Sequence, residues 1–481
     1  MTNHALVWYY QSMIKIVAEN NSVRVENASN DFLRTLELKY SWFDCINLNN
    51  RVLFFSAAQK CGYLGLTHVI ADELKEKEIP YQLSFGRNEQ FKGKHQEWKF
   101  TGSYRIGQKE AVEAVLEKRI GIVKAPPGTG KTCIMSAIVA NTKGRTLILM
   151  ERGEPQAQAV NAFGDFTNIV PTSYTGKEKK FSDVIVATVQ TVSKAIDNKN
   201  EQMMEWLKDV DTILVDECHH VATDMYLKVL ETIPNAKYCV GVSATPDDRE
   251  DSSGNYVTAS VGNVIYEIGY GTLIDHKVLV PVSIYVEKMP TIEDTTKSKG
   301  FFNDAPKTEH VQYSDIYEQY IINNTHRNQA CANFVEDCIG NKMSVAVVVS
   351  RVEHAHALAK LIPQAEVLVS ENKNRKEVIG RLKNKELLVV ITTLFDEAVD
   401  VPSLDAVAVM AGGKSKIKLK QRIRSTRSFT GDTVYGHTVK KRGYVWIPYD
   451  QAKFIKSHSQ KNIKELREIV AEHPLNTLEI I

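Results

Sequence analysis

Short apolar runs separated by helix-length segments recur along the chain between about residue 100 and residue 270. The runs are four or five residues long and contain almost no polar positions. Continuous apolar runs that alternate with helices are typical of a parallel sheet covered on both faces. The strands expected here are Ile120–Val123, Thr146–Met150, Val184–Ala187, Thr212–Val215 and Cys239–Ser243.

The same alternation returns after about residue 320. It predicts further strands at Ser344–Val349, Glu366–Val369, Leu387–Ile391 and Ala406–Met410. Two α/β units of similar size indicate two tandem parallel-sheet lobes, with boundaries expected at 96–282 and 283–481. Residues 290–312 contain few aliphatic side chains, so we expect them to form an excursion from the second lobe.

The first 95 residues have a different pattern. Short alternating segments at Ser22–Val25 and Arg51–Phe55 predict strands, and Leu66–Lys77 has the spacing of an amphipathic helix. These features predict a small α+β accessory domain, which we expect to bind DNA although it contains no recognisable catalytic motif. The polar stretch Gly86–Trp98 is expected to be a linker.

Composition narrows the class of protein. The 481 residues are 43% hydrophobic and 25% charged, as in ordinary globular proteins. The sequence contains no run of about eighteen apolar residues, so we expect no membrane span. The seven cysteines are scattered without a Cys-x-x-Cys pair, and the first residues do not resemble a secretion signal, which favours a cytoplasmic protein. Because the formal net charge is only +2, any affinity for nucleic acid must come from local basic clusters.

Residues 125–132, with the sequence APPGTGKT, lie between an apolar run and a helical repeat. Glycines in such a turn let backbone N–H groups point inward at a helix N-terminus, where they bind phosphate. The lysine would reach the β- and γ-phosphates of ATP and the last hydroxyl would ligate Mg²⁺. The alternative is a glycine-rich turn before an ordinary helix. The residues expected around the phosphates are Pro127, Gly128, Thr129, Gly130, Lys131 and Thr132.

Two polar motifs follow later strands of the first lobe. Asp216 and Glu217 come directly after the fourth expected strand, where Asp216 would hold Mg²⁺ and Glu217 would polarise the attacking water. In isolation, two such acids usually form a solvated edge. Ser243 and Thr245 end the next strand and could hydrogen-bond the acidic motif, although alone they would be an ordinary turn.

This ordered set of motifs resembles the superfamily 2 helicases and translocases. The resemblance implies two RecA-like lobes with ATP between them and nucleic acid crossing both. It implies that Tyr104, Arg105 and Gln108 read the adenine, with Phe100 or Tyr104 as a stacking face. The alternative for Gln108 is a helix cap. His219 would couple the nucleotide to the strand, together with Ser243, Thr245 and Gln421.

The resemblance also implies strand-contacting residues. In the first lobe, Thr188 and Gln190 match the family's motif, whereas Glu151–Glu154 departs from it. In the second lobe, Arg351 belongs to the fourth motif, and the fifth carries strand contacts and residues that face the nucleotide. Those strand contacts are Thr392 or Thr393, and those facing the nucleotide are Glu397 and Asp400, with Ala398 standing where the family commonly has Gly.

The sixth motif of the family usually reads Gln-x-x-Gly-Arg-x-x-Arg. Here the glycine is missing, but Arg424 and Arg427 keep the Arg-x-x-Arg spacing. We therefore expect both arginines to reach the γ-phosphate, where such a residue contributes about three to five powers of ten in rate.

Residues 414–427 carry seven basic side chains and no acid. Such a run is often a solvated face, but beside the sixth motif it favours contact with the phosphate backbone through Lys416, Lys418 and Lys420. In the excursion, Phe301 and Phe302 stand beside lysines. They could stack on a base or open a duplex, or they could pack back onto the lobe.

Three segments narrow the resemblance. They are residues 271–281, 443–450 and 457–463, which are similar to the branch-migration helicases of large phages, of the UvsW type, which are related to RecG and to the type III restriction subunit. The function expected is an ATP-dependent, Mg²⁺-requiring DNA helicase for forked and four-way-junction DNA in replication, recombination or repair. Its location would be the cytoplasm, of the host cell if a phage encodes it, with no membrane and no obligatory protein partner. The alternatives are an RNA helicase, the motor subunit of a restriction complex and a nucleotide-dependent binding switch.

Overall fold

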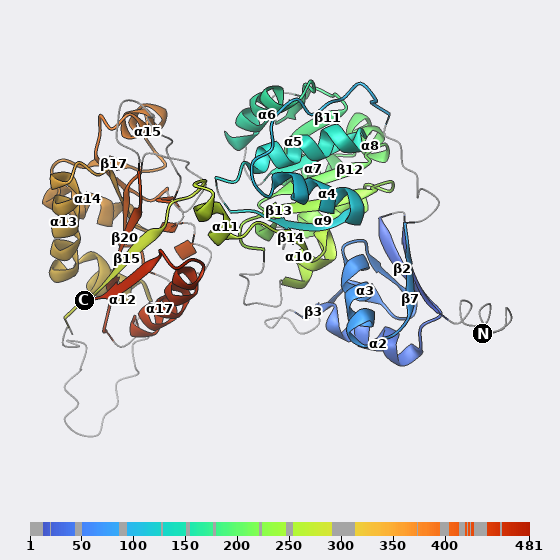
Figure 1. The fold of residues 1–481 in the computed structure, drawn as a ribbon, viewed down its shortest axis with the longest axis horizontal. Coiled ribbons are helices and arrows are strands. Elements are labelled where there is room, and N and C mark those ends of the chain that lie inside the picture. Colours follow the sequence, from blue (N-terminus) through green and yellow to red (C-terminus); the bar gives the residue numbers. More distant parts are fainter. Residues whose placement is uncertain are drawn as a thin grey trace. The chain divides into compact units, whose positions relative to one another are not determined.

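The chain folds into two compact units, Met1–Ile268 and Gly269–Ile481 (Figure 1). The expected lobe division at 282/283 differs from this one by helix α11 (Tyr270–Asp275) and the segment that follows it. The structure is a computed structural model that describes residues 13–19, 21–43, 51–85, 94–126, 128–150, 154–176, 179–220, 224–246, 254–290, 313–372, 374–394, 404–412, 419–420, 422–423, 425–427, 440–452 and 455–481.

The first unit contains a seven-stranded sheet in the order β10-β11-β9-β12-β13-β8-β14, with all neighbours parallel. The expected strands are confirmed as β8 (Ile120–Lys124), β9 (Thr146–Met150), β11 (Val184–Thr188), β12 (Thr212–Asp216) and β13 (Tyr238–Ser243). Strands β10 (Thr172–Tyr174) and β14 (Val264–Glu267) complete the two edges. The apolar runs are buried because helices cover both faces, as a parallel sheet requires.

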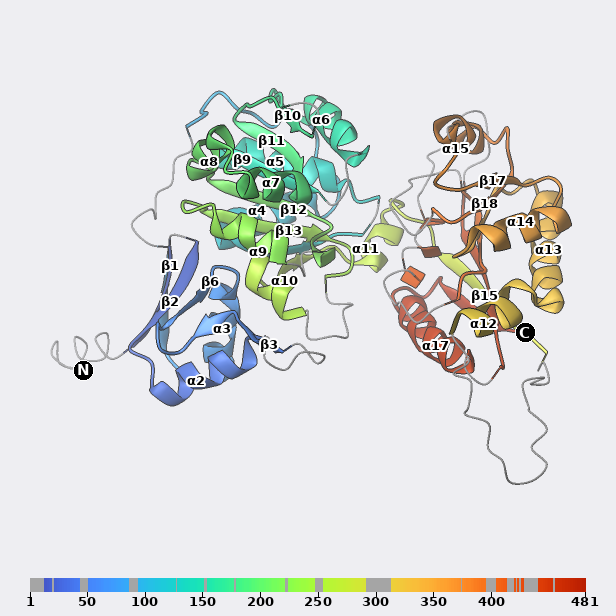
Figure 2. The same ribbon diagram turned by 180° about the vertical axis from the view of Figure 1, so that it is seen from behind.

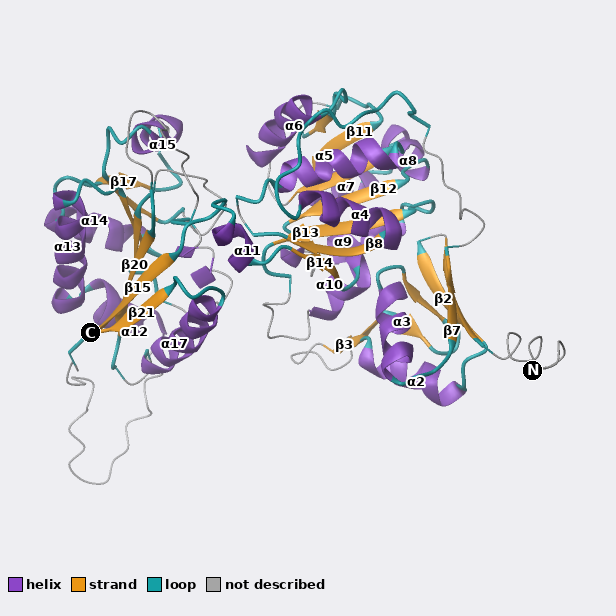
Figure 3. Ribbon diagram, in the orientation of Figure 1, coloured by secondary structure: helices purple, strands orange, loops and turns teal. Residues whose placement is uncertain are grey.

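Two groups of helices form these layers. In the first group, α5 contacts both α4 and α6. In the second group, α7 contacts α8 and α9, and α9 contacts α10. In Figure 1 the first group lies in front of the sheet, and in Figure 2 the second does, while Figure 3 shows the strands between them. The helices are α4 (Gln108–Lys118), α5 (Lys131–Thr142), α6 (Glu154–Phe166), α7 (Val189–Asp197), α8 (Glu201–Lys208), α9 (Asp224–Glu231) and α10 (Gly254–Val261).

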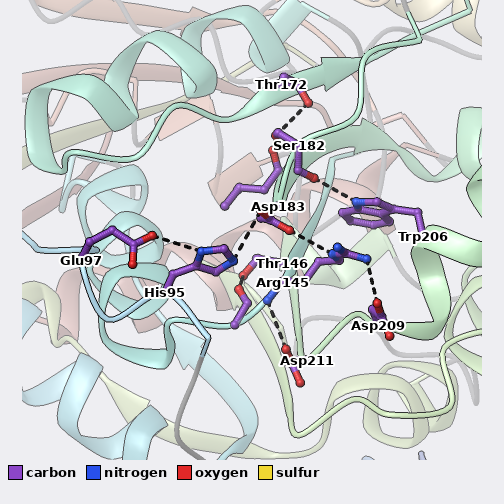
Figure 4. Close-up of polar contacts among 12 residues, drawn as sticks. His95, Glu97, Arg145, Thr146, Thr172, Ser182, Asp183, Trp206, Asp209 and Asp211 are labelled. Carbon is purple, nitrogen blue, oxygen red and sulfur yellow. Dashed lines mark hydrogen bonds and ion pairs between the residues drawn. The ribbon is translucent and has the colours of Figure 1, made fainter.

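A network of polar side chains lies at the edge of this sheet where the parallel strands begin (Figure 4). Arg145, which precedes β9, pairs with Asp183 before β11 and with Asp209 before β12, at 3.2 Å each. His95 lies 3.5 Å from the second oxygen of Asp183 and stacks on Trp98. The network therefore ties the starts of three strands together and fixes the segment that enters the lobe.

In its described residues the N-terminal domain has a five-stranded sheet in the order β5-β6-β2-β1-β7 and two helices. Helix α3 (Leu66–Glu76) confirms the amphipathic prediction, and α2 (Asn30–Lys39) is an additional helix capped by the Ser29 hydroxyl. The strands are β1 (Ile14–Glu19), β2 (Ser22–Glu26), β5 (Phe55–Ser56), β6 (Cys61–Tyr63) and β7 (Tyr81–Ser84), with β3 (Ser41–Phe43) and β4 (Arg51–Leu53) as a separate pair.

This domain packs against α9 and α10 of the first lobe (Figures 1 and 2). Its apolar core continues into Leu227 of α9 and Tyr256 of α10. The backbone N–H of Gly65 donates to the carbonyl of Ala259 at 3.1 Å, and a Cβ on Gly65 would collide with that carbonyl. The accessory domain is thus part of the first unit.

The second unit contains another seven-stranded parallel sheet, in the order β17-β18-β16-β19-β20-β15-β21. The second run of expected strands is confirmed as β16 (Val345–Val348), β17 (Glu366–Leu368), β18 (Val389–Thr392) and β19 (Ala406–Val409). The sheet also contains β15 (Val282–Lys288), β20 (Gly443–Tyr449) and β21 (Thr477–Ile480). The predicted pair of tandem RecA-like lobes with a small N-terminal domain is therefore confirmed.

The second sheet is also enclosed by helices, with separate apolar clusters on its two faces. In addition to α11, the helices are α12 (Tyr313–Tyr317), the π-helical turn η2 (Glu318–Ile322), α13 (Thr325–Gly340), α14 (Val352–Leu361), α15 (Arg375–Lys383) and α17 (Lys456–Ala471). No helix in the described parts of the chain is long and apolar enough to cross a bilayer.

Candidate active site

The phosphate loop connects β8 to the start of α5, as predicted. Gly128 and Gly130 adopt φ values of 85° and 77°, which favour glycine. The hydroxyl of Thr129 donates to the Pro126 carbonyl at 2.6 Å and stabilises the turn. Helix α5 begins at Lys131, so its N-terminal N–H groups follow directly on the loop. Pro127 lies outside the described residues.

Lys131 meets the acidic motif at the end of β12. Its ammonium forms an ion pair with Glu217 and lies 4.0 Å from Asp216. Burial raises the pKa of Asp216 to about 6, with Lys131 opposing the rise and the adjacent Glu217 adding to it. Glu217 has a φ of 47°, a left-handed conformation that is costly outside glycine and is common at catalytic sites.

His219 joins the acidic motif to the end of β13. Its Nδ1 lies 3.3 Å from a Glu217 oxygen and 2.8 Å from the Ser243 hydroxyl, which in turn accepts a hydrogen bond from the Thr245 N–H. The Ser243 carbonyl accepts from the N–H of Ala125 at 2.8 Å, at the start of the phosphate loop. Motifs far apart in sequence therefore meet because β13 lies between β12 and β8.

Gln108 lies beside the loop, and both the oxygen and the nitrogen of its side-chain amide hydrogen-bond to backbone groups. Its Oε1 accepts from the N–H of Arg105 at 2.7 Å, and its Nε2 donates to the Thr129 carbonyl at 2.5 Å. Gln108 is the first residue of α4, whose N-cap is Gly107 without a side-chain cap, and its two hydrogen bonds tie the segment before the helix to the phosphate loop. The rings of Phe100 and Tyr104 stack on each other at 4.5 Å.

The donor set at this edge suits Mg²⁺. Thr132 supplies a hydroxyl on the first turn of α5 and Asp216 supplies a carboxylate, and Mg²⁺ prefers oxygen ligands. Nucleotide-binding sites typically hold this ion through one or two protein ligands plus phosphate oxygens and water. Among the described residues, no cluster of three or more His, Cys, Asp or Glu side chains forms an all-protein metal site.

Comparison with known proteins agrees with this geometry. Residues 102–248 match the family model of the type III restriction enzyme res subunit. The chain is 28% identical over 362 residues to "Putative helicase 22" of Sulfolobus islandicus filamentous virus, covering 71% of this chain and 62% of that protein. It is 21% identical over 345 residues to "DNA 3'-5' translocase XPB2" of Sulfurisphaera tokodaii, covering 66% and 76%.

These matches support a resemblance of the chain to the superfamily 2 helicases. The match spans less than two thirds of the viral relative's length. Among solved structures, T4 UvsW aligns over 98% of this chain and 99% of its own, at 19% identity and a TM-score of 0.43.

In the first lobe, the candidates for contact with nucleic acid lie at the end of β11, on the same edge of the sheet as the phosphate loop. The Thr188 hydroxyl caps α7 by accepting from the N–H of Thr191 at 3.2 Å. The side chain of Gln190 is exposed on the first turn of that helix. Both residues therefore stand at a helix N-terminus, which favours phosphate.

In the second lobe, Arg351 follows β16 and places its guanidinium 4.9 Å from the ring centroid of Tyr317. Thr392 is fully buried, and its hydroxyl accepts from the N–H of Leu394 at 3.0 Å. Thr393 is partly exposed. Of these two threonines, only Thr393 has a side chain that is accessible to a nucleic-acid strand.

Arg427, the second arginine of the sixth motif, has its side chain in the interior of the second unit. It is almost fully buried within the second unit, where it pairs with Glu472 at 2.8 Å and lies over the ring of Tyr270. Its Nε and Nη2 are buried without a hydrogen-bond partner among the described residues. Sequence reasoning missed Glu472 and Tyr270, because nothing in their local pattern links them to the sixth motif.

Several predicted site residues lie outside the described residues, so the structure gives no account of their side chains. Lys420 is described and is partly exposed beside the buried Leu419. The predicted residues outside the described parts are Pro127, Phe301, Phe302, Glu397, Asp400, Lys416, Lys418, Gln421 and Arg424.

Proposed function

We propose that this chain is an ATP-driven DNA translocase that unwinds or branch-migrates forked and four-way-junction DNA in replication, recombination or repair. The observation that carries the proposal is the connected network of Lys131, Glu217, His219 and Ser243. A passive nucleotide switch has no need of a lysine, an acid and a coupling histidine in contact. The XPB2 relative, which is named a DNA translocase, supports DNA as the polymer.

In the proposed cycle, ATP draws Lys131 away from Glu217 and onto the β- and γ-phosphates. The Glu217 carboxylate is then free to polarise the attacking water. Because His219 contacts both Glu217 and Ser243, any shift of Glu217 is passed to the end of β13. Bound Mg²⁺, held by Thr132 and Asp216, would neutralise charge on the transferring phosphoryl group.

We propose that Arg424 and Arg427 complete the site from the second lobe. For Arg427, this requires its ion pair with Glu472 to open. The buried, incompletely hydrogen-bonded guanidinium supports such a change, because unsatisfied buried donors are costly where they lie.

Branched DNA as the substrate rests on the likeness of residues 271–281, 443–450 and 457–463 to phage branch-migration helicases. Restoring base pairs on the far side of a junction returns most of the stacking lost, which averages about 1.4 kcal/mol per step. Branch migration therefore needs little net work per ATP. We place this activity in the cytoplasm, of the host cell if a virus encodes the chain.

The proposal is tested by measuring ATP turnover with single strands, duplexes, forks, four-way junctions and RNA of matched sequence. We expect forks and junctions to stimulate turnover most. Stimulation by RNA alone would support the RNA-helicase alternative, and no stimulation by any polymer would contradict a nucleic-acid motor.

A second candidate is the motor subunit of a restriction complex, which the family match to a type III restriction res subunit favours. Such a motor would depend on a partner methylase and on DNA that carries its recognition site. Turnover by the isolated chain on junctions that lack any particular sequence would exclude it.

A further inference from the structure

A short helical segment lies across the edge of the second sheet at which its strands end. It comprises α12 and the π-helical turn η2, residues 313–322, and we call it the platform segment. Its buried side chains, including Tyr317 and Ile321, pack with Ile455, which follows β20. Tyr317 also contacts Arg351 after β16 and Gly412 after β19. The platform segment thus touches residues that follow three strands.

The contact with Arg351 fixes the direction of that side chain. The guanidinium lies over the Tyr317 ring, whose side chain is itself almost fully buried and held by the platform segment. A guanidinium stacked on an aromatic face keeps its N–H groups in a plane, where they remain available to donate to phosphate oxygens. The stack therefore presents Arg351 in a defined orientation.

The contact with Gly412 involves the same tyrosine. The Gly412 N–H donates to the Tyr317 hydroxyl at 3.3 Å. A Cβ on Gly412 would lie 3.0 Å from the Tyr317 ring and 2.5 Å from Ile321, so the backbone can approach this closely only at glycine. Gly412 stands two residues before Lys414, the first basic residue of the run 414–427. Tyr317 therefore contacts both Arg351 and Gly412, which follow two different strands of the sheet.

We infer that Tyr317 is a positioning residue that orients Arg351 toward a nucleic-acid backbone. This inference rests on the proposed function, in which Arg351 contacts the strand. Tyr317 acts through Arg351 and does not itself touch the polymer. Its ring orients Arg351, and its hydroxyl accepts a hydrogen bond from the Gly412 N–H without a role in the strand contact.

The inference is tested by replacing the ring and the hydroxyl separately in the full-length protein. Tyr317→Leu and Tyr317→Met remove the aromatic face, whereas Tyr317→Phe removes only the hydroxyl. We expect the first two to raise the DNA concentration for half-maximal ATPase stimulation about three- to tenfold, in keeping with a cation–π contact. They should also reduce the slope of log affinity against log salt by up to about 0.9, the share of one phosphate contact. Tyr317→Phe should keep the full slope.

Tyr320→Leu is the matched control, because it removes a buried tyrosine of the same platform segment. It should lower the thermal midpoint without changing the salt slope. A merely structural role for Tyr317 would instead give Tyr317→Leu the behaviour of Tyr320→Leu, and that result would overturn the inference.

A double-mutant cycle separates the inference from the function on which it rests. If Tyr317 works through Arg351, then Tyr317→Leu should add little to the loss caused by Arg351→Ala. Additive losses would refute the inference while leaving Arg351 as a strand contact. If Arg351→Ala alone leaves DNA stimulation unaltered, the strand-contact proposal itself fails.

Discussion

At the scale of single residues, the site is organised by contacts between charged groups. Lys131 is neutralised by Glu217 and Asp216 in this structure, so phosphate binding must replace one anionic partner by another. Such an exchange costs less than uncovering a buried ammonium with no partner. The same logic applies to Arg427, which Glu472 holds within its own lobe.

Replacing Lys131 by Ala should abolish ATP hydrolysis and leave junction binding largely intact, because the lysine is expected to touch phosphate and not the strand. Turnover and DNA affinity would be measured on the same preparation. Lys208→Ala, which removes an exposed lysine paired with Glu205 on α8, is the control and should change neither. Persistent hydrolysis without Lys131 would remove the central assignment.

A buried histidine makes the second unit sensitive to acid. Burial lowers the pKa of His354 to about 3, with the positive charge of Arg327 adding to the effect. Between pH 6.5 and pH 3 the unfolded chain binds a proton at this site that the folded chain does not. Stability is therefore fully present above about pH 6.5 and is lost as pH falls.

Comparison with His354→Gln isolates this contribution, since the amide can still hydrogen-bond Asn328. On going from pH 7 to pH 5, the free energy of unfolding of the wild type should fall about 2 kcal/mol further than that of the variant. Urea denaturation at the two pH values measures the difference. Equal losses in the two proteins would show that His354 is not responsible.

At the scale of elements, the order of strands determines which motifs can cooperate. The ends of β12, β13 and β8 are adjacent, so the acidic motif, Ser243 and the phosphate loop form one continuous hydrogen-bonded edge. In the second sheet, the platform segment brings together residues that follow β16, β19 and β20. In each sheet these contacts gather at the edge where the parallel strands end, which is the usual ligand edge of such sheets.

The basic run before Arg427 provides a prediction at this scale. Replacing Lys416, Lys418 and Lys420 by Ala should reduce the slope of log DNA affinity against log salt by up to about 2.7, because each phosphate contact contributes about 0.9. Removing the same number of charges from α17, by replacing Lys456, Lys461 and Lys464, controls for net charge and should change the slope little. An unchanged slope in the first variant would argue for a solvated face.

At the scale of the whole molecule, the N-terminal domain is built into the first unit. It rests on α9, which follows the acidic motif, and on α10, which follows Ser243 and Thr245. Hydrogen bonds from Asn255 to the carbonyls of Lys39 and Ser41, at 3.2 and 3.1 Å, reinforce the apolar contact. A domain fixed in this way moves with α9 and α10, the helices that follow the catalytic motifs in sequence.

Gly65→Ala should disrupt this docking, because the added Cβ would collide with the carbonyls of Thr258 and Ala259. We expect a lower thermal midpoint and faster proteolysis within the linker 86–98. Gly164→Ala is the matched control, since no atom lies within 4 Å of its added Cβ, and on helix α6 it should be neutral or stabilising by about 0.5–1 kcal/mol. If Gly65→Ala and Gly164→Ala had the same thermal midpoint and the same rate of proteolysis, the N-terminal domain would not be tightly docked on α10.

The sequence by itself determined the elements of the two lobes and their local chemistry. Continuous apolar runs identified the central strands, and the glycine-lysine-threonine motif identified the phosphate loop, because both signals depend only on neighbouring residues. Helix α2 was also within reach of this reasoning, since Ser29 and Asp31 precede Phe32, Leu33 and Leu36 at helical spacing. The strands β20, β15 and β21, which form one side of the second sheet, were harder to assign, because their partners come from distant parts of the chain.

Only the tertiary structure decided which side chains meet. The inward position of Arg427, the burial of Thr392 and the seating of Arg351 on Tyr317 depend on contacts across strands that are far apart in sequence. The docking of Gly65 on α10 has the same origin. Local sequence patterns indicate the chemistry of which a side chain is capable, whereas strand order and packing determine which residue it contacts.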